Sequence, residues 1–199
     1  MDLYQTQFCN TGFMNGLGDF IMSHPTCNGN TAALCDAILS QFTTLEDAAR
    51  ALTSCDRKAV GCKLYRIQRQ VLVDPSTFFV NQTITKAGTC NGESKNCGCM
   101  HAEQQAVLYA KEDARKFTTM LCTSSPCVNC ANLIAVSQTS IKKFFYGLSS
   151  SDKRGIAILE ESGIVVASKK DILNLLTAYR GQNNDVKQAE RTYAALTKS

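Results

Sequence analysis

Four residues between positions 101 and 130 have the types and the spacing of a metal centre with an acid–base group beside it. They are His101, Glu103, Cys127 and Cys130. One imidazole and two thiolates are typical zinc ligands, and three protein ligands leave the fourth position of zinc open for chemistry, whereas structural zinc is usually closed by four. The pattern therefore favours a catalytic zinc held by His101, Cys127 and Cys130.

Glu103 follows His101 by two residues and is the candidate catalytic residue. That offset places its carboxyl in the same helical turn but away from the direction of the ligand. Zinc lowers the pKa of water toward about 7. A carboxyl beside that water can take its proton and later deliver it to a leaving group, which is usually worth about 10²–10⁴ in rate.

Two helix starts must meet to bring these residues together. Pro126 is well suited to the first position of a helix, because that residue needs no backbone donor. Cys127 and Cys130 then share one face of the first turn, where the positive end of the helix dipole favours thiolates. His101 is expected to open a second helix. A zinc ribbon built on Cys97, Cys99, Cys127 and Cys130 is the structural alternative, but it leaves His101, Glu103 and Pro126 without a role.

The remaining pattern predicts an α/β fold. A hairpin with an unusually long connection comes first, and strands alternate with helices after residue 100. Such alternation implies right-handed crossovers and a mainly parallel sheet. We expect a three-layer αβα sandwich with a mixed five-stranded sheet. The expected helices are 31–41, 43–54 (with a capping box from Thr43 to Glu46), 101–116, 126–137, 155–162 and 171–179, and the expected strands are 59–68, one within 77–86, 118–123, 141–146 and 164–167.

Three regions follow from this division. Residues 1–42 are an N-terminal extension of unknown role packed on the catalytic domain, residues 43–180 are the catalytic domain, and residues 181–199 are a polar C-terminal helix or tail.

Composition restricts the class of protein. The chain has 199 residues, a net charge of +4 and no tryptophan. This mild positive charge suits an anionic small molecule and does not argue for a polynucleotide. The eleven cysteines are odd in number, no signal peptide is recognisable, and no apolar run approaches the ~20 residues of a membrane span. We therefore expect a cytoplasmic protein with thiols kept for metal or packing, a disulfide framework being the alternative.

Several stretches of this sequence match one known family. They are His101-Ala102-Glu103 with Ala106, Thr123 to Cys130, Thr89-Cys90-Asn91-Gly92, 54–61, 141–143 and 158–164. On these stretches, from about Leu45 to Val166, the sequence resembles the deoxycytidylate (dCMP) deaminases of the cytidine deaminase-like superfamily, the phage-type members most of all. Gln105, Cys90 and Ser151 depart from the family pattern, which has Asn, Tyr and often an aromatic residue there.

The resemblance implies an activity and its partners. Water replaces the 4-amino group of dCMP, which gives ammonia and dUMP for thymidylate synthesis. It implies that Asn91 contacts the sugar, and Ala102 and Ser125 within the matching motifs are further candidates for substrate contact. It also implies a homo-oligomer and regulation by dCTP and dTTP. The mild charge argues against a nucleic-acid partner, and the lack of a long apolar run argues against a membrane partner. Candidate partners for the phosphate are Lys86, Lys95 and Arg154.

Some members of that family bind a second, structural zinc through a cysteine equivalent to Cys55. In this chain Cys55, Cys97 and Cys99, with His24 or Cys27, could supply its ligands. The alternatives are small buried thiols and, for His24 to Cys27, a surface turn.

Other functions remain open at this point. The enzyme could accept a modified or triphosphate pyrimidine, or it could be a tRNA adenosine deaminase, since the two zinc motifs are shared. A different class is an inactive deaminase-like subunit that binds nucleotides. The retained Glu103 argues against that class, because a binding protein does not need a proton shuttle.

Overall fold

A computed structural model describes residues 30–68, 71–73, 78–83, 90, 98–112, 117–137, 139–178 and 180–181. Its helices are α2 (Asn30–Leu52), α3 (Ala102–Glu112), α4 (Val128–Val136), α5 (Arg154–Glu161) and a C-terminal helix over 169–178. Its strands are β1 (Gly61–Gln68), β2 (Val71–Val73), β3 (Phe78–Val80), β4 (Gln82–Thr83), β5 (Cys99–Met100), β6 (Thr119–Ser124), β7 (Lys143–Leu148) and β8 (Val165–Ser168).

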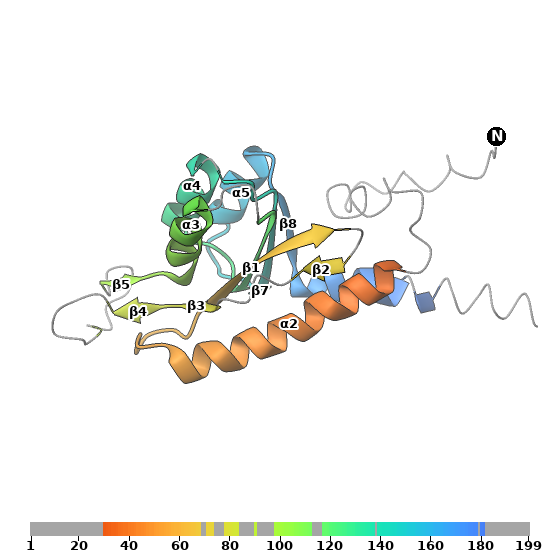
Figure 1. Cartoon of the computed structure of the whole chain (residues 1–199), viewed down its shortest axis with the longest axis horizontal. Coiled ribbons are helices and arrows are strands. Elements are labelled where there is room, and N and C mark those ends of the chain that lie inside the picture. Colours follow the sequence, from red (N-terminus) through yellow and green to blue (C-terminus); the bar gives the residue numbers. More distant parts are fainter. Residues whose placement is uncertain are drawn as a thin grey trace, which may run out of the picture.

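One mixed sheet organises the molecule (Figure 1). Its order is β2-β1-β6-β7-β8, with β3 also paired to β1. Since β2 faces the end of β1 at Arg66 to Gln68 and β3 faces its start at Gly61 to Lys63, the two short strands share one edge position. The sheet therefore has the five positions expected from the sequence. Strands β6, β7 and β8 are parallel, and β1 is antiparallel to β6.

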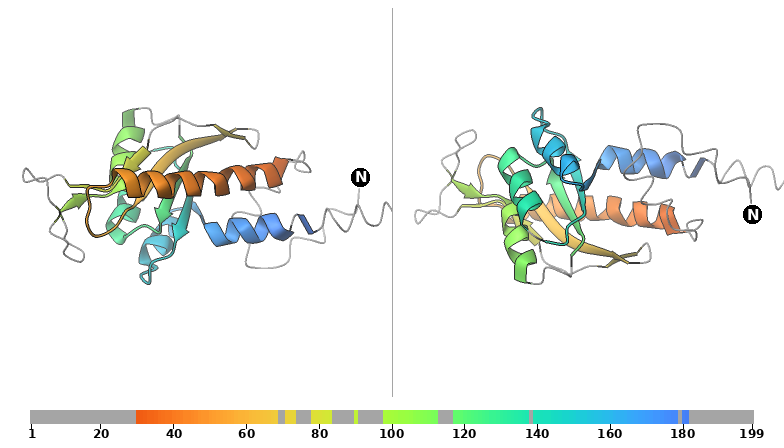
Figure 2. Two further views of the ribbon diagram at one scale, coloured as in Figure 1. Left: turned by 90° about the horizontal axis from the view of Figure 1, so that it is seen from below. Right: turned by 90° about the horizontal axis from the view of Figure 1, so that it is seen from above.

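Helices cover both faces of the sheet and make the three layers (Figures 1 and 2). Helices α3, α4 and α5 enclose one core, which includes Cys62, Met120 and Cys122. Helix α2 and the C-terminal helix lie side by side over the other face, where Leu121 and Phe145 are buried. Every residue of β6 is buried, as expected for a central strand covered on both sides. The predicted αβα sandwich is confirmed.

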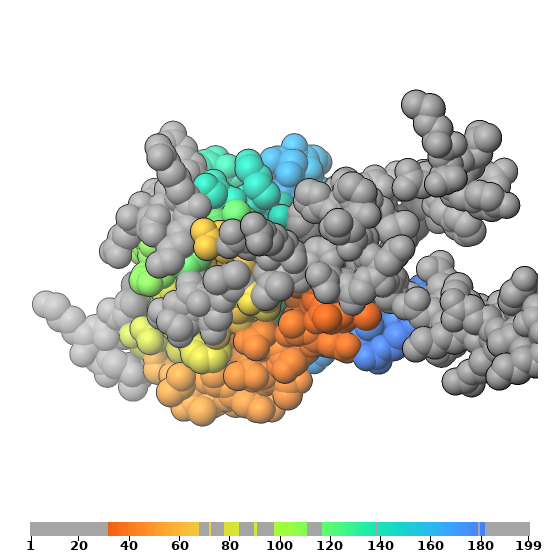
Figure 3. Space-filling view, turned by 45° about the vertical axis from the view of Figure 1, so that its right-hand side comes forward, coloured from red at the N-terminus to blue at the C-terminus, as the bar shows by residue number. Residues whose placement is uncertain are grey.

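Helix α2 corrects one expectation. The chain forms a single helix through the predicted break, and Thr43 and Glu46 lie inside it, so the predicted capping box is wrong. The reason is an apolar stripe at helical spacing that is buried without interruption. Its members are Leu34, Ile38, Phe42, Leu45 and Ala49. In the space-filling view α2 forms a continuous ridge along one side of the molecule (orange in Figure 3).

The first hairpin is confirmed and gains one strand. Strand β3 lies within the region 77–86 and pairs antiparallel with the start of β1, as predicted. The additional strand β2 pairs with the end of β1, where Gln68 faces Val71.

The expected regions 1–42, 43–180 and 181–199 stay a prediction. Helix α2 runs across the first boundary, at residues 42 and 43. Residues 1–29 and 182–199 lie outside the described residues.

Candidate active site

His101, Cys127 and Cys130 converge at the start of α3 and α4. The Nδ1 atom of His101 lies 3.4 Å from Sγ of Cys130 and 3.8 Å from Sγ of Cys127. The ligand atoms of this set lie within 4.8 Å of one another. Tetrahedral zinc with ordinary bond lengths requires about 3.6 Å between a nitrogen and a sulfur ligand. The donor types and their separations therefore fit zinc.

The backbone around Cys127 explains how the two thiols are brought together. Cys127 is the N-cap of α4 in an extended conformation, and its Sγ accepts a hydrogen bond of 3.5 Å from the backbone N–H of Cys130. Pro126 therefore precedes the cap. The prediction that Pro126 would be the first residue of the helix is wrong. Because Cys130 stands three residues after the cap, its own thiol still turns to the same side as Cys127.

The electrostatics of the pair favour one thiolate. Hydrogen bonds from the Cys130 thiol and from His101 lower the pKa of Cys127 to about 4, although burial opposes this. The pKa of Cys130 is raised, first by its hydrogen bond to Cys127 and then by burial. A thiolate next to an imidazole is the state that a zinc ion binds.

Glu103 lies in the first turn of α3 and is almost fully buried. Among the described residues, its Oε2 atom has no hydrogen-bond partner although it is shielded from solvent. Burial raises the pKa of this carboxyl, and the charges of His101 and Lys58 oppose the shift. A buried carboxyl oxygen without a partner is costly to keep. The Oε2 atom of Glu103 is therefore a buried acceptor to which a bound ligand could donate a hydrogen bond.

Comparison with known proteins identifies the family of this chain. A sequence model of the cytidine and deoxycytidylate deaminase zinc-binding region matches residues 41–148, which include His101, Glu103, Cys127 and Cys130. The chain belongs to this family.

Two curated relatives are fungal deoxycytidylate deaminases. The protein from Saccharomyces cerevisiae is 29% identical over 136 residues, 64% of this chain and 43% of the relative. The protein from Schizosaccharomyces pombe is 26% identical over 136 residues, 63% of this chain and 42% of the relative. This deaminase-family chain thus spans less than half the length of either relative.

A solved structure supports the fold. The dCMP deaminase from the cyanophage S-TIM5, in complex with dCMP and dUMP, superposes with a TM-score of 0.51 and 23% identity, covering 65% of this chain and 93% of that one. No described helix of this chain is both long and apolar enough to span a membrane.

Asn81 positions α3, the helix that follows His101 and carries Glu103, and no motif in the sequence points to it. Its Oδ1 accepts the N–H of Ala102 at 2.9 Å, which caps the start of α3. Its backbone oxygen accepts from the Thr53 hydroxyl at 2.8 Å and from the N–H of Ser54 at 3.3 Å. Asn81 therefore ties the segment after α2 to the helix that follows His101. Asn81 lies inside the region 77–86 in which the sequence predicted a strand without a register, and the observed strand β3 ends one residue before it.

Two glutamine side chains also hold the start of α3 in place. The side chain of Gln104 accepts the backbone N–H of His101 at 2.8 Å. Gln105, which replaces the usual asparagine of the family motif, donates its amide to the carbonyl of Val80 at 2.6 Å. The first contact holds the backbone of His101, and the second holds the first turn of α3 against the end of β3.

The residues predicted to contact the substrate differ in their surroundings. Ala102 is fully buried, and its N–H is already bonded to Asn81. Ser125 is buried beside the cysteine motif, and its hydroxyl accepts the N–H of Ser150 at 2.8 Å. Asn91, Lys86 and Lys95 lie outside the described residues.

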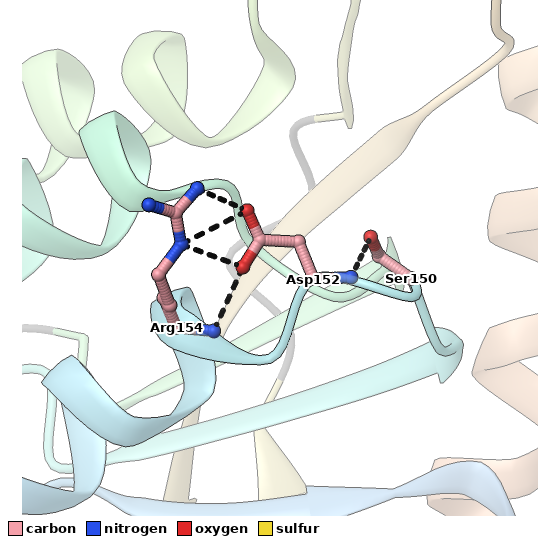
Figure 4. Close-up of polar contacts among 3 residues, drawn as sticks. All are labelled: Ser150, Asp152 and Arg154. Atoms are coloured by element: carbon pink, nitrogen blue, oxygen red, sulfur yellow. Dashed lines mark hydrogen bonds and ion pairs between the residues drawn. The ribbon is translucent and has the colours of Figure 1, made fainter.

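Arg154, the other candidate for the phosphate, is engaged elsewhere (Figure 4). Its Nε donates to both carboxylate oxygens of Asp152 at 3.0 and 3.2 Å, and its Nη2 reaches one of them at 2.7 Å. The guanidinium is thereby neutralised by its neighbour.

A second cysteine cluster lies near β5. The ligand atoms of Cys55, Cys90 and Cys99 lie within 4.8 Å of one another, and the sulfurs of Cys55 and Cys90 are 3.8 Å apart. The set expected from the sequence is thus partly found, with Cys90 joining Cys55 and Cys99. The other expected ligands, Cys97, His24 and Cys27, lie outside the described residues.

Proposed function

We propose that this chain catalyses the zinc-dependent deamination of dCMP to dUMP and ammonia. The observation that carries the proposal is the convergence of His101, Cys127 and Cys130 beside the buried, unpartnered carboxyl oxygen of Glu103. The names of the fungal relatives support dCMP as the substrate.

His101, Cys127 and Cys130 would hold the zinc, which when bound polarises a water molecule and lowers its pKa toward about 7. Glu103 handles the protons of the reaction. Its carboxylate takes one proton from the attacking water and delivers it to ring N3, and a second proton transfer reaches the departing 4-amino group. One water is consumed and one ammonia leaves, so the atoms balance.

The burial of Glu103 supports this role. With only 3% of its surface exposed, the carboxyl exchanges protons with the substrate and not with bulk solvent. Its neighbours Gln104 and Asn81 hold the backbone of the same turn in place, so that the carboxyl needs little reorganisation during the reaction.

An ammonia-release assay tests the substrate. The panel is cytosine, cytidine, dCMP, CMP, dCTP and an anticodon-stem RNA. We expect the highest kcat/KM for dCMP. Preference for the RNA would support the tRNA deaminase alternative, and no turnover of any compound by the zinc-loaded protein would support an inactive subunit.

Replacing Glu103 by Gln tests the mechanism. We expect kcat to fall by about 10²–10⁴ because the amide cannot accept the proton, while the zinc content is retained. The matched control is Glu161→Gln at the exposed end of α5, which should keep wild-type kcat. Normal turnover by Glu103→Gln would remove this residue from the mechanism.

We also propose that Cys55, Cys90 and Cys99 hold a second, structural zinc. Three thiols at these separations fit the tetrahedral geometry, which places two sulfur ligands about 3.8 Å apart. Assembly into a homo-oligomer, regulation by dCTP and dTTP, and a cytoplasmic location stay predictions.

A further inference from the structure

The second cysteine cluster combines a buried thiol with two that solvent can reach. The sulfurs of Cys55 and Cys90 lie 3.8 Å apart, and Sγ of Cys99 lies within 4.8 Å of both. Cys55 is buried, whereas Cys90 and Cys99 are half-buried. Because oxidation of a thiol requires access for the oxidant, Cys90 and Cys99 are the members of this cluster that a dissolved oxidant can meet.

Cys90 is the better placed of the two accessible thiols. Its sulfur lies against that of Cys55, while Sγ of Cys99 contacts Oγ1 of Thr83 at 3.6 Å. A disulfide has an S–S bond of about 2 Å, so a shift of about 2 Å would join Cys55 to Cys90. Cys90 also stands where the family motif has tyrosine, so the pair depends on a residue in which this chain departs from its family.

Hydrogen bonds connect the cluster to the start of α3. The backbone N–H of Cys55 donates to Oγ1 of Thr53 at 3.2 Å, and the Thr53 hydroxyl donates to the carbonyl oxygen of Asn81 at 2.8 Å. The side chain of Asn81 in turn accepts the N–H of Ala102. A shift of Cys55 therefore acts on the residue that caps the catalytic helix.

A second connection runs through the two-stranded ribbon of β4 and β5 (Figure 1). Thr83 of β4 pairs with Cys99 of β5, and its hydroxyl donates to the carbonyl oxygen of Ser54 at 2.8 Å. Cys99 precedes His101 by two residues. The ribbon thus links the neighbour of Cys55 to the segment that ends at the zinc ligand His101.

The charge of the cluster favours its oxidation over that of the catalytic thiols. If both sets hold zinc, three thiolates exceed the charge of the divalent ion, whereas two thiolates and a neutral imidazole only balance it. The sulfurs of the second cluster therefore keep more negative charge. Since the thiolate is the nucleophile toward an oxidant, this cluster should react before Cys127 and Cys130.

We infer that Cys55 and Cys90 are a site of reversible oxidation, at which a hydroperoxide produces a disulfide that displaces the start of α3 and lowers activity. This inference goes beyond the proposed function, because disulfide formation does not depend on which substrate the enzyme takes. It uses the same three cysteines as the proposed second zinc.

The reaction has two steps. The Cys90 thiolate attacks one oxygen of the hydroperoxide, the O–O bond breaks, and Cys90 becomes a sulfenic acid while an alcohol or water leaves. The Cys55 thiol then attacks the Cys90 sulfur, and the sulfenic oxygen leaves as water. Two electrons pass from the two thiols to the peroxide. A dithiol reductant returns them by thiol–disulfide exchange.

Oxidation would also end metal binding at the cluster. Zinc is bound by thiolates, and the two sulfurs of a disulfide are no longer thiolates. Cys99 alone would remain as a ligand among these three residues, so a zinc held there would be released.

Peptide mapping by mass spectrometry under non-reducing conditions tests the disulfide in the zinc-loaded wild-type protein. After treatment with a small molar excess of hydrogen peroxide, we expect a peptide linked through Cys55 and Cys90, and zinc released to a chromophoric chelator. Hydrogen–deuterium exchange at the start of α3 should become faster, because its cap is displaced. Dithiothreitol with added zinc should reverse all three changes.

Activity gives a separate readout. We expect kcat/KM for dCMP to fall about tenfold on oxidation, as when groups that orient a metal ligand are lost, and to recover with dithiothreitol. The Cys90→Ser variant should keep its own kcat/KM through the same treatment. The matched control is Cys35→Ala, which removes a buried cysteine outside both clusters and should respond to peroxide as the wild type does.

The outcomes separate this inference from the proposed function. A disulfide between Cys127 and Cys130 without a Cys55–Cys90 link would overturn the inference, as would a Cys55–Cys90 link that leaves the exchange at α3 unchanged. If the untreated wild-type protein deaminates no compound, the proposed function fails. The peptide map and the exchange measurement then still decide whether the disulfide forms and whether it displaces α3.

Discussion

At the scale of single residues, the active site depends on atoms that are not ligands. Asn81 is the clearest case, because one buried side chain caps α3 and its backbone anchors the segment after α2. Chemistry alone would select His101, Glu103 and the cysteines, since zinc ligands and carboxyls are recognisable by type. An asparagine that holds a helix start is recognised only from its contacts.

Replacing Asn81 by Ala tests this positioning role. The N–H of Ala102 would lose its acceptor in a buried place, so we expect a loss of about 1–3 kcal/mol in the free energy of unfolding, together with a lower kcat. Urea unfolding and the ammonia assay give the two readouts. The control is Gln82→Ala at the neighbouring exposed position. Identical unfolding free energies in the two variants would show that the cap contributes nothing.

At the scale of the elements, the approach of α5 to the cysteine motif sets the position of Cys127. A Cβ on Gly155 would lie 2.2 Å from the Pro126 carbonyl oxygen and 3.1 Å from the carbonyl carbon of Cys127. Both contacts are with backbone, which cannot turn aside as a flexible side chain does. Glycine is therefore required here by close packing.

The variant Gly155→Ala should push α5 away from Pro126. We expect a loss of about 1–3 kcal/mol in the free energy of unfolding, as for other overpacked sites, and weaker zinc retention in a chelator competition. Gly181→Ala is the matched control, because a Cβ there meets nothing within 4 Å. Equal thermal midpoints for both variants would contradict the packing argument.

At the scale of the whole molecule, the second cysteine cluster joins distant parts of the chain. Cys55 follows α2, Cys99 lies in β5 two residues before His101, and Cys90 precedes both β5 and α3. A metal that closes such loops stabilises the folded state more than the unfolded one. A zinc here would hold the approach to the catalytic helix in place.

Metal analysis tests the second zinc. We expect two equivalents per chain in the wild-type protein and one in Cys90→Ser, with a lower thermal midpoint. The control is Cys35→Ala, a buried cysteine of α2 outside both clusters, which should keep two. One equivalent in wild type, unchanged in Cys90→Ser, would dispose of the second site.

Sequence patterns were sufficient to predict the layered fold and to nominate a candidate set of zinc ligands. Ligand type, the three-residue spacing of Cys127 and Cys130, and the alternation of strands and helices are local properties, and a short window reveals them. It placed one helix break wrongly at Thr43, because a local capping signal was weaker than the buried apolar stripe that continues through α2.

The contacts between residues far apart in the sequence follow from the tertiary fold. Lys58 reaches Ser124 across 66 positions, Cys55 reaches Cys90 across 35, and Asn81 reaches Ala102 across 21. These contacts depend on the pairing and register of β1, β3 and β6, which periodicity cannot fix. The zinc motif could be found in the sequence, whereas the residues that hold it in place, such as Asn81, follow from packing.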